Sequence, residues 1–201
     1  MSIFNPEEQN KELDNKIVAG LERLSMVFRV LLWEKAKFWS LSPIQIQIII
    51  FISNHTPEKS TVSYLSKEFN LTKPTISDAV RILESKEVIE KIHTGTDGRS
   101  YQLKLTQKGV GIVQDCDNYT EPLSDLLEHS SFTDKEIIWN NIFSMIQHMY
   151  DNNIISIQRS CKNCNNYAYD GHIHFCRLLK IELLNKDLRI DCSEFIPAVV
   201  Y

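Results

Sequence analysis

The pattern that most restricts the fold of this chain lies between residues 60 and 106. Two stretches with helical periodicity, STVSYLSKEFN (residues 60–70) and LTKPTISDAVRILESK (residues 71–86), follow each other directly. Asn70 can take the left-handed backbone of a tight exit, and Thr72 can cap the helix that begins after it. Two helices joined by so short a turn predict a helix-turn-helix, whose second helix presents small polar and basic side chains.

The hydrophobic pattern changes its period directly after these two helices. VIEKIH and SYQLKL alternate apolar and polar residues, as strands with one buried face do. Between them lies TGTDGR, in which Gly95, Asp97 and Gly98 tolerate the positive φ that a hairpin turn needs. A helix-turn-helix followed by a hairpin predicts a winged helix, with its DNA-binding part at about residues 41–106.

Helical periodicity also precedes this segment. Apolar residues recur at three- and four-residue steps over residues 7–38, which predicts one long helix there. Ser42 then predicts the start of a second helix as its cap, with Pro43 at the first helical position and Gln45 completing a capping box.

Two further helices are expected after the wing. Thr106 would begin a helix over residues 106–128, and Thr133, with Glu136 three residues on, would cap a last helix that ends near residue 155. The expected fold class is therefore mainly α with a small β-wing, in a domain that spans residues 1–155. Residues 156–201 would form a separate small module.

The charge of the chain is unevenly distributed. Residues 59–108 contain nine Lys or Arg against six Asp or Glu, whereas the rest contains thirteen against twenty, for a net charge of -4. A basic segment inside an acidic body would be directed toward a polyanion such as DNA. The sequence shows neither a secretory signal nor an apolar stretch long enough to span a bilayer, so a cytoplasmic protein without membrane contact is expected.

The decapeptide DGRSYQLKLT carries the sharpest family signature. It fits the wing pattern D-x-R-x-x-x-L-x-L-T, and from about residue 10 to 155 the chain resembles the MarR family of bacterial transcription regulators in the order and length of its elements. LSPIQ and KPTISDAVRILESK are similar to that family as well. One departure is Glu87, where family members usually place a glycine to leave the recognition helix; it would change the angle of the wing.

The second helix of the helix-turn-helix offers residues suited to DNA. Lys73, Ser77 and Arg81 lie four residues apart and therefore on one face, with Thr75 beside them. Short polar side chains suit a helix that approaches the major groove, and Arg81 can reach a phosphate or a guanine edge. A solvated helix face would show the same pattern without binding anything.

The wing and the helix before it supply the remaining candidates. Arg99 at the hairpin tip can enter a minor groove, where negative potential is concentrated, and Asp97 can hold it at a fixed angle. Thr61 and Ser63, at the start of the first helix of the pair, are expected to contact backbone phosphates.

The resemblance also implies a partner and a ligand. MarR regulators are homodimers in which the first helix and the last two helices interlock, so two recognition helices about one DNA turn apart (~34 Å) would read a palindromic operator in double-stranded DNA. Many members bind a small-molecule effector near the dimer helices. The aromatic residues that would line such a pocket here, unless they are ordinary core, are Phe28, Trp33, Phe38 and Trp39.

Four of the five cysteines fall in the last 45 residues. Cys161, Cys164, Cys176 and Cys192 are spaced as C-x2-C-x11-C-x15-C. A CxxC pair can direct two sulfurs at one ion, and two further thiols complete a tetrahedral site. In a reducing compartment such a set predicts a metal site rather than disulfides. The fifth, Cys116, is interpreted as a small buried apolar residue.

Ligand chemistry leaves two occupants for these thiols. A closed site of four thiolates usually holds Zn²⁺, which stabilises a segment too small to bury its own core, and zinc is the favoured interpretation. A [4Fe–4S] cluster is the alternative, because the second CxxC of a zinc ribbon is missing. Zinc would make the module structural, and a cluster would make it a sensor.

The function that these observations predict is sequence-specific DNA binding by a homodimeric transcriptional regulator. No Ser/His/Asp or Cys/His arrangement and no phosphate-binding glycine loop occurs in the sequence, so an enzyme is not expected. Two alternatives remain open at this point. One is a redox or metal-dependent enzyme carried on a winged-helix domain, and the other is a winged helix that binds proteins instead of DNA.

Overall fold

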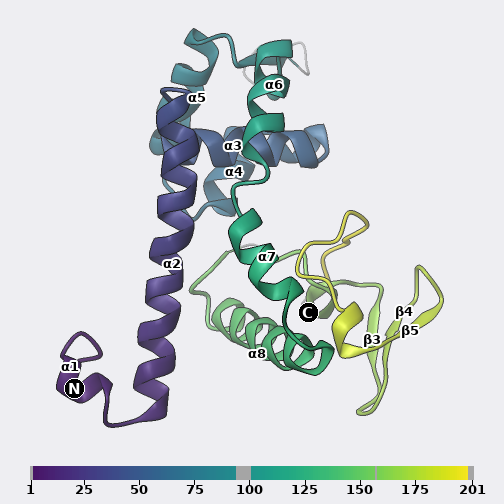
Figure 1. Ribbon diagram of the computed structural model, residues 1–201. Coiled ribbons are helices and arrows are strands. Elements are labelled where there is room, and N and C mark those ends of the chain that lie inside the picture. Colours follow the sequence, from purple (N-terminus) through teal and green to yellow (C-terminus); the bar gives the residue numbers. More distant parts are fainter. Residues whose placement is uncertain (1, 94–100, 157, 199–201) are drawn as a thin grey trace. The chain divides into compact units, whose positions relative to one another are not determined.

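The computed structural model describes residues 2–93, 101–156 and 158–198 (Figure 1). The chain packs into two compact units. The first unit contains Met1–Thr61 and Ser77–Ser124, and the second contains Val62–Ile76 and Asp125–Tyr201. Helices α5 (Lys73–Ser85) and α7 (Glu121–Glu128) run across this division. The division into residues 1–155 and 156–201 stays a prediction from the sequence.

Helix α3 is the centre of the first unit. Because almost every face of α3 is apolar, it is buried on several sides, and it packs against α2, α6 and β2. Helix α3 is bent from α2 by 89° (Figure 1). Ile46, Ile48 and Ile49 are fully buried there. The elements that lie wholly in this unit are α1 (Pro6–Gln9), α2 (Leu13–Phe38), α3 (Pro43–Asn54), η1 (Pro57–Lys59), β1 (Ile89–His93), β2 (Tyr101–Leu105) and α6 (Gln107–Cys116).

The start of α3 confirms the predicted capping box. The Ser42 side chain accepts a hydrogen bond from the backbone N–H of Gln45, while the Gln45 side chain accepts one from the backbone N–H of Ser42. The single helix predicted over residues 7–38 is wrong at its start. Glu12 is extended (φ -124°, ψ 145°), so the short α1 ends before α2 begins.

Two other helix boundaries differ from the prediction. The helix expected over residues 106–128 is broken into α6 and α7, because a turn closes between them with hydrogen bonds from Tyr119 N to Cys116 O and from Glu121 N to Asn118 O. The last long helix, α8 (Phe132–Asp151), is capped by Ser131 rather than Thr133, and the Ser131 hydroxyl accepts from Asp134 N.

The second unit joins the start of the helix-turn-helix to the cysteine-rich segment. It contains α4 (Val62–Glu68), α8, η2 (Cys161–Asn163), η3 (Asn185–Asp187) and a three-stranded antiparallel sheet in the order β3-β4-β5. Its strands are β3 (Tyr167–Tyr169), β4 (His174–Cys176) and β5 (Ile181–Leu183).

A small apolar core holds the cysteine-rich segment to α8. Phe143 of α8 is buried with Leu183 and Leu188, and partly buried Trp139, Cys161, Tyr167 and Cys176 pack around them. The Trp139 indole Nε1 also donates to the backbone oxygen of Asn185, at 2.9 Å. The module therefore shares its core with a helix that precedes it in the chain.

Membrane-spanning potential is low in the described segments. No single helix there is long and apolar enough to cross a bilayer, and only the bent pair α2 and α3 meets that test together, on length and composition alone.

Candidate nucleic-acid interface and metal centre

Helix α5 is amphipathic in the way that the sequence predicts. Thr72 caps it, since the backbone N–H of Thr75 donates to the Thr72 hydroxyl at 3.3 Å. Asn70, just before it, has φ 50°, the left-handed backbone expected of the turn. The inward-facing apolar stripe of α5 is buried; its members are Ile76, Ala79, Val80 and Leu83. The opposite side of the helix is left for polar contacts.

The predicted DNA-contacting residues of α5 are all exposed. Lys73, Thr75, Ser77 and Arg81 present their side chains to solvent. Arg81 pairs with Asp78 at 2.8 Å along the same helix, a solvated ion pair that costs little to break. The Thr75 hydroxyl lies 2.8 Å from that of Thr72 and helps to fix the start of the helix.

The helix before the turn places its two candidates differently. Ser63 is exposed, whereas Thr61 is half-buried. Only Ser63 therefore offers its side chain freely to a phosphate in this structure. The DNA-binding role of both residues stays a prediction.

The base of the wing is anchored where the sequence places it. Strands β1 and β2 pair antiparallel from Ile89 opposite Leu105 to His93 opposite Tyr101, and Leu103 is only 2% exposed. Leu105 is half-buried. Asp97 and Arg99, predicted at the tip, lie outside the described residues, so their DNA contacts stay a prediction.

Glu87 leaves the recognition helix as a glycine would. Its φ is 57°, in the left-handed region that L-residues rarely adopt. The backbone N–H of Glu87 donates to Glu84 O at 2.9 Å, and the Thr106 hydroxyl donates to Glu87 O at 2.6 Å. The backbone at this helix end is therefore left-handed, as it would be with glycine, but Glu87 carries conformational strain there that glycine would not.

The four aromatic residues assigned to an effector pocket are largely exposed. Phe28, Trp33 and Phe38 are 44%, 58% and 74% exposed. Trp39 is half-buried, and its Nε1 donates to the Asp115 carboxylate at 2.9 Å. These positions leave the effector pocket a prediction.

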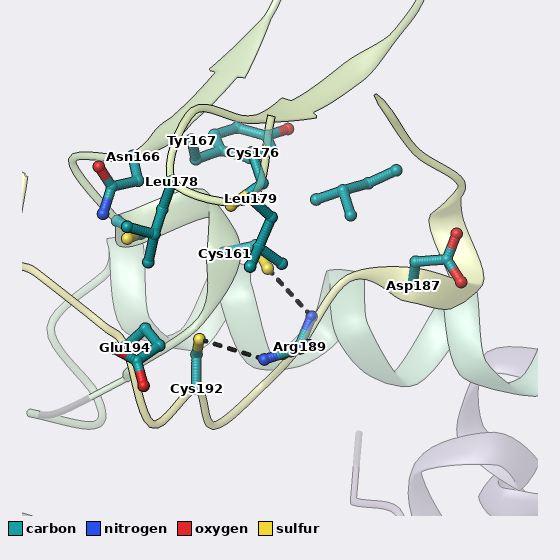
Figure 2. A pocket seen from close by; sticks show the side chains of 12 residues that line it. Cys161, Asn166, Tyr167, Cys176, Leu178, Leu179, Asp187, Arg189, Cys192 and Glu194 are labelled. Carbon is teal, nitrogen blue, oxygen red and sulfur yellow. Dashed lines mark hydrogen bonds between the residues drawn. The ribbon is translucent and has the colours of Figure 1, made fainter. Parts of the chain in front are cut away.

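The four predicted metal ligands line one hollow. Cys161 begins η2, Cys164 follows it, Cys176 ends β4, and Cys192 lies in the loop after η3. The hollow measures about 40 Å³ and is lined mostly by apolar surface. Figure 2 shows the labelled cysteines, Cys161, Cys176 and Cys192, reaching it from separate segments, with Leu178 and Leu179 beside them.

Arg189 hydrogen-bonds two of these sulfurs. Its backbone N–H donates to Cys161 Sγ at 3.2 Å, and its Nη1 donates to Cys192 Sγ at 3.7 Å (Figure 2). Burial raises the pKa of the Cys161 thiol and the nearby Cys192 and Cys176 thiols raise it further, while the Arg189 N–H opposes them. A positive centre in the hollow would stabilise the thiolate form of Cys161, which burial disfavours.

Donor groups for a single ion do not come together in the described ranges. Among those residues, no three His, Cys, Asp or Glu side chains are grouped closely enough to hold one metal ion. Both ring nitrogens of His174 are already engaged, Nδ1 with Tyr167 Oη at 2.6 Å and Nε2 with Asn185 Oδ1 at 2.9 Å. The donor groups that line the hollow are the four thiols and the carboxylates of Asp187 and Glu194, and the metal stays a prediction.

Cys116 lies in the other unit and has a different character. It is fully buried in α6. Burial, with smaller contributions from neighbouring carboxylates, raises its thiol pKa to about 11. It is therefore a neutral apolar side chain at ordinary pH, as the sequence suggests.

Sequence reasoning missed Arg159, a buried cation beside the cysteines. Its side chain is 5% exposed and donates to three residues, Asp191, Glu68 and Tyr64. Burial lowers the pKa of this guanidinium, but the hydrogen bonds to Asp191 and Glu68 outweigh it and raise the pKa above the ordinary value. An arginine in the run SIQRSC carries no periodic or motif signal that would have marked it.

Comparison with known proteins supports the fold. The MarR family model matches residues 39–100. No curated protein matches the chain.

Solved structures extend the likeness beyond that segment. The chain resembles the DNA complex of S. aureus MepR, with a TM-score of 0.58 and 20% identity over 65% of this chain and 96% of that one. It also resembles a MarR protein from Peptoclostridium difficile, with a TM-score of 0.59 and 18% identity over 71% of this chain and 92% of that one. For transcriptional regulator PA3341 the TM-score is 0.56, with 17% identity over 67% of this chain and 98% of that one. The chain therefore has the winged-helix fold of these regulators, and its helix-turn-helix segment matches the MarR family model.

Proposed function

We propose that this protein is a sequence-specific DNA-binding transcriptional regulator. The observation that carries the proposal is α5, which buries its apolar stripe and exposes Lys73, Thr75, Ser77 and Arg81 ahead of a two-stranded wing. The similar S. aureus MepR was solved bound to DNA. A basic, polar helix of this kind approaches a major groove, and the sequence predicts that Arg99 of the wing enters the adjacent minor groove.

The protein acts as a homodimer on a palindromic operator. One recognition helix contacts few bases, and a second copy about one DNA turn (~34 Å) away doubles the contact surface. Long apolar stripes on α2 and α8 support this assembly, since large exposed apolar faces mark interaction surfaces. The exposed members that would meet the partner copy are Leu21, Leu24, Val30, Ile142, Met145 and Met149.

The C-terminal module binds a metal centre through Cys161, Cys164, Cys176 and Cys192. Their common hollow and the N–H···S hydrogen bonds from Arg189 support this role, because such bonds orient and tune metal-bound sulfur. Zinc would make the centre structural, and an iron–sulfur cluster would make it sensory. A small-molecule effector beside Phe28, Trp33, Phe38 and Trp39 remains a further proposal.

DNA selection from a random duplex library, followed by fluorescence anisotropy on the recovered sequence, tests the regulator assignment. Arg81→Ala and Lys73→Ala should each weaken binding by roughly 10-fold and reduce the salt dependence by about one ion. Lys16→Ala, which removes an exposed lysine from α2, is the matched control and should leave both values unchanged. Affinity that does not change in the α5 variants would exclude this helix as the DNA-reading element.

A further inference from the structure

The positions of the four cysteine thiols bear on the kind of metal centre that they could bind. A zinc ion lies about 2.3 Å from each of its sulfurs, which brings any two of them to about 3.8 Å. The part of the chain that the structure describes holds no group of three such donors in reach of a single ion. All four cysteines nevertheless line the same hollow. The thiols are therefore placed for an occupant that offers each sulfur its own metal atom.

The size and lining of the hollow fit an occupant of several atoms. One water-sized sphere needs about 10–15 Å³ of such space, and the hollow measures about 40 Å³. Its walls include Leu178, Leu179, Leu183 and Tyr167, so an occupant would lie against apolar side chains. The N–H groups of Arg189 point at two sulfurs, as donors around cluster ligands do.

We propose that the hollow binds a [4Fe–4S] cluster, with one iron each on Cys161, Cys164, Cys176 and Cys192. The four ligands come from the η2 turn (Cys161 and Cys164), the end of β4 and the loop after η3, and a cubane has one corner for each thiolate. This assignment names the occupant of the metal centre in the proposed function. Of the two occupants that ligand chemistry allows, zinc and a [4Fe–4S] cluster, this assignment selects the cluster.

Metal and sulfide analysis of the full chain, purified without oxygen, tests the assignment. The apoprotein is reconstituted in parallel with ferrous iron plus sulfide and with zinc alone. Expected are about four iron and four sulfide per chain, a brown colour with broad visible absorption, and loss of both in Cys164→Ser. Cys116→Ala, in the other unit, should keep the cluster.

Three results would overturn the cluster. One zinc ion per chain that iron and sulfide do not displace would show that the cysteines form a structural zinc site. Two iron and two sulfide would exclude the four-iron form, and no bound metal at all would remove the site. DNA binding is measured on the same samples, so failure of the regulator assignment is seen separately from failure of the cluster.

A second inference rests on Arg159, which connects a ligand segment to the helix-turn-helix. Its Nε and Nη2 donate to the Asp191 carboxylate at 2.7 and 2.6 Å, and the backbone N–H of Cys192 donates to the Arg159 oxygen at 3.1 Å. The same guanidinium donates to the Glu68 carboxylate at 2.5 and 3.2 Å and to Tyr64 Oη at 3.1 Å.

These contacts join the loop that carries Cys192 to α4, the helix that precedes the recognition helix. Charge-assisted, bidentate hydrogen bonds hold a fixed geometry. A shift of Asp191 would therefore move the Arg159 guanidinium relative to Glu68. Ser156 adds a parallel link, because its hydroxyl hydrogen-bonds Lys67 O at 2.6 Å and Asn70 Oδ1 at 2.7 Å. If the loop that carries Cys192 rearranges when the cluster is lost, these contacts would therefore shift α4 and the turn that follows it.

We infer that Arg159 is a positioning residue that transmits occupancy of the cysteine hollow to DNA affinity. The inference rests on the proposed regulator function. The informative variant is Glu68→Ala, which removes the carboxylate that pairs with Arg159 from α4 while the Arg159–Asp191 pair remains. The measured quantity is the ratio of operator affinities of the metal-loaded and metal-free protein, a coupling of typically 5- to 150-fold in regulated systems.

The expected result is a wild-type ratio of roughly 10-fold that falls to near one in Glu68→Ala, with an unchanged metal content. Tyr64→Phe, which removes only the hydroxyl acceptor, should lower the ratio part of the way. A purely structural role would lower stability and leave the ratio intact, and that result would overturn the inference. A wild-type ratio of one would overturn it as well, whereas absence of DNA binding in every sample would instead refute the regulator function.

Discussion

Replacing Arg159 by methionine should destabilise the second unit by about 3 kcal/mol. Methionine keeps much of the side-chain stem and removes a guanidinium that is 5% exposed. Removing one partner of a buried ion pair costs about 3–5 kcal/mol, because the remaining charges lose their partner without regaining full hydration. Asp191 is 42% exposed and Glu68 is 18% exposed, so both recover part of their hydration and the lower end of that range applies.

Urea unfolding followed by tryptophan fluorescence measures this loss. The chain has three tryptophans, and only Trp139 lies in the second unit, so a background of Trp33→Phe and Trp39→Phe reports on that unit alone. Metal occupancy is held constant, since a bound ligand shifts the apparent stability. With an m-value of about 2 kcal/mol/M, the midpoint should fall by about 1.5 M urea.

The control is Arg177→Met, which removes an exposed guanidinium whose hydrogen bond within the described residues runs from Nη1 to Asn165 O, at 3.2 Å. A surface change of this kind costs about 0.5 kcal/mol or less. Adding Glu68→Ala to Arg159→Met should cost little more, because the two residues stabilise the unit as a pair. A loss at Arg159 no larger than that of the control would refute the reasoning that the buried guanidinium holds the segments of this unit together.

Three further predictions concern the first unit. Glu87→Gly should raise the free energy of unfolding by about 1 kcal/mol, visible as a higher thermal midpoint, because an L-residue in the left-handed region costs about 1–2 kcal/mol; a lower midpoint would contradict this. Gly109→Ala should cost about 1–3 kcal/mol, since the added Cβ would meet Val88 O at 2.2 Å, whereas Gly111→Ala meets nothing within 4 Å and should be neutral or stabilising in the same melt. Cys116 should resist iodoacetamide in the folded protein at pH 8 and gain reactivity only as the pH approaches about 11, where its buried thiol ionises; rapid alkylation of its peptide, located by mass spectrometry, would show that it is not buried in solution.

The elements that short-range chemistry determines were predictable from the sequence. The Ser42 and Gln45 capping box, the left-handed Asn70 and the inward stripe of α5 all depend on neighbours within four residues. The errors occurred where two local solutions compete. Ser131 and Thr133 are both residue types that suit a helix cap, and in the structure Ser131 takes that position.

The candidate metal centre was predictable in part for the same reason. The spacing of the cysteines identified the donor set, because CxxC restricts where two sulfurs can lie. The spacing gives no distance between sulfurs from separate strands, so it could not distinguish a single ion from a larger occupant. Arg159 reaches Glu68 across 91 residues and the Arg189 N–H reaches Cys161 Sγ across 28, and neither contact follows from a local pattern.

The shared packing of α4, α8 and the cysteine-rich segment limits how such a protein can be recombined. A graft of residues 156–201 onto another winged-helix regulator would transfer the ligands but not the acceptors of Arg159 or the apolar surface that receives Leu183. The recipient would need a carboxylate and a phenol at the positions of Glu68 and Tyr64, and an aromatic residue at that of Phe143. The module can therefore be inherited only together with α8, which directly precedes it, and α4, which lies far from it in the sequence. Exchange of gene segments between regulators would rarely yield a working copy.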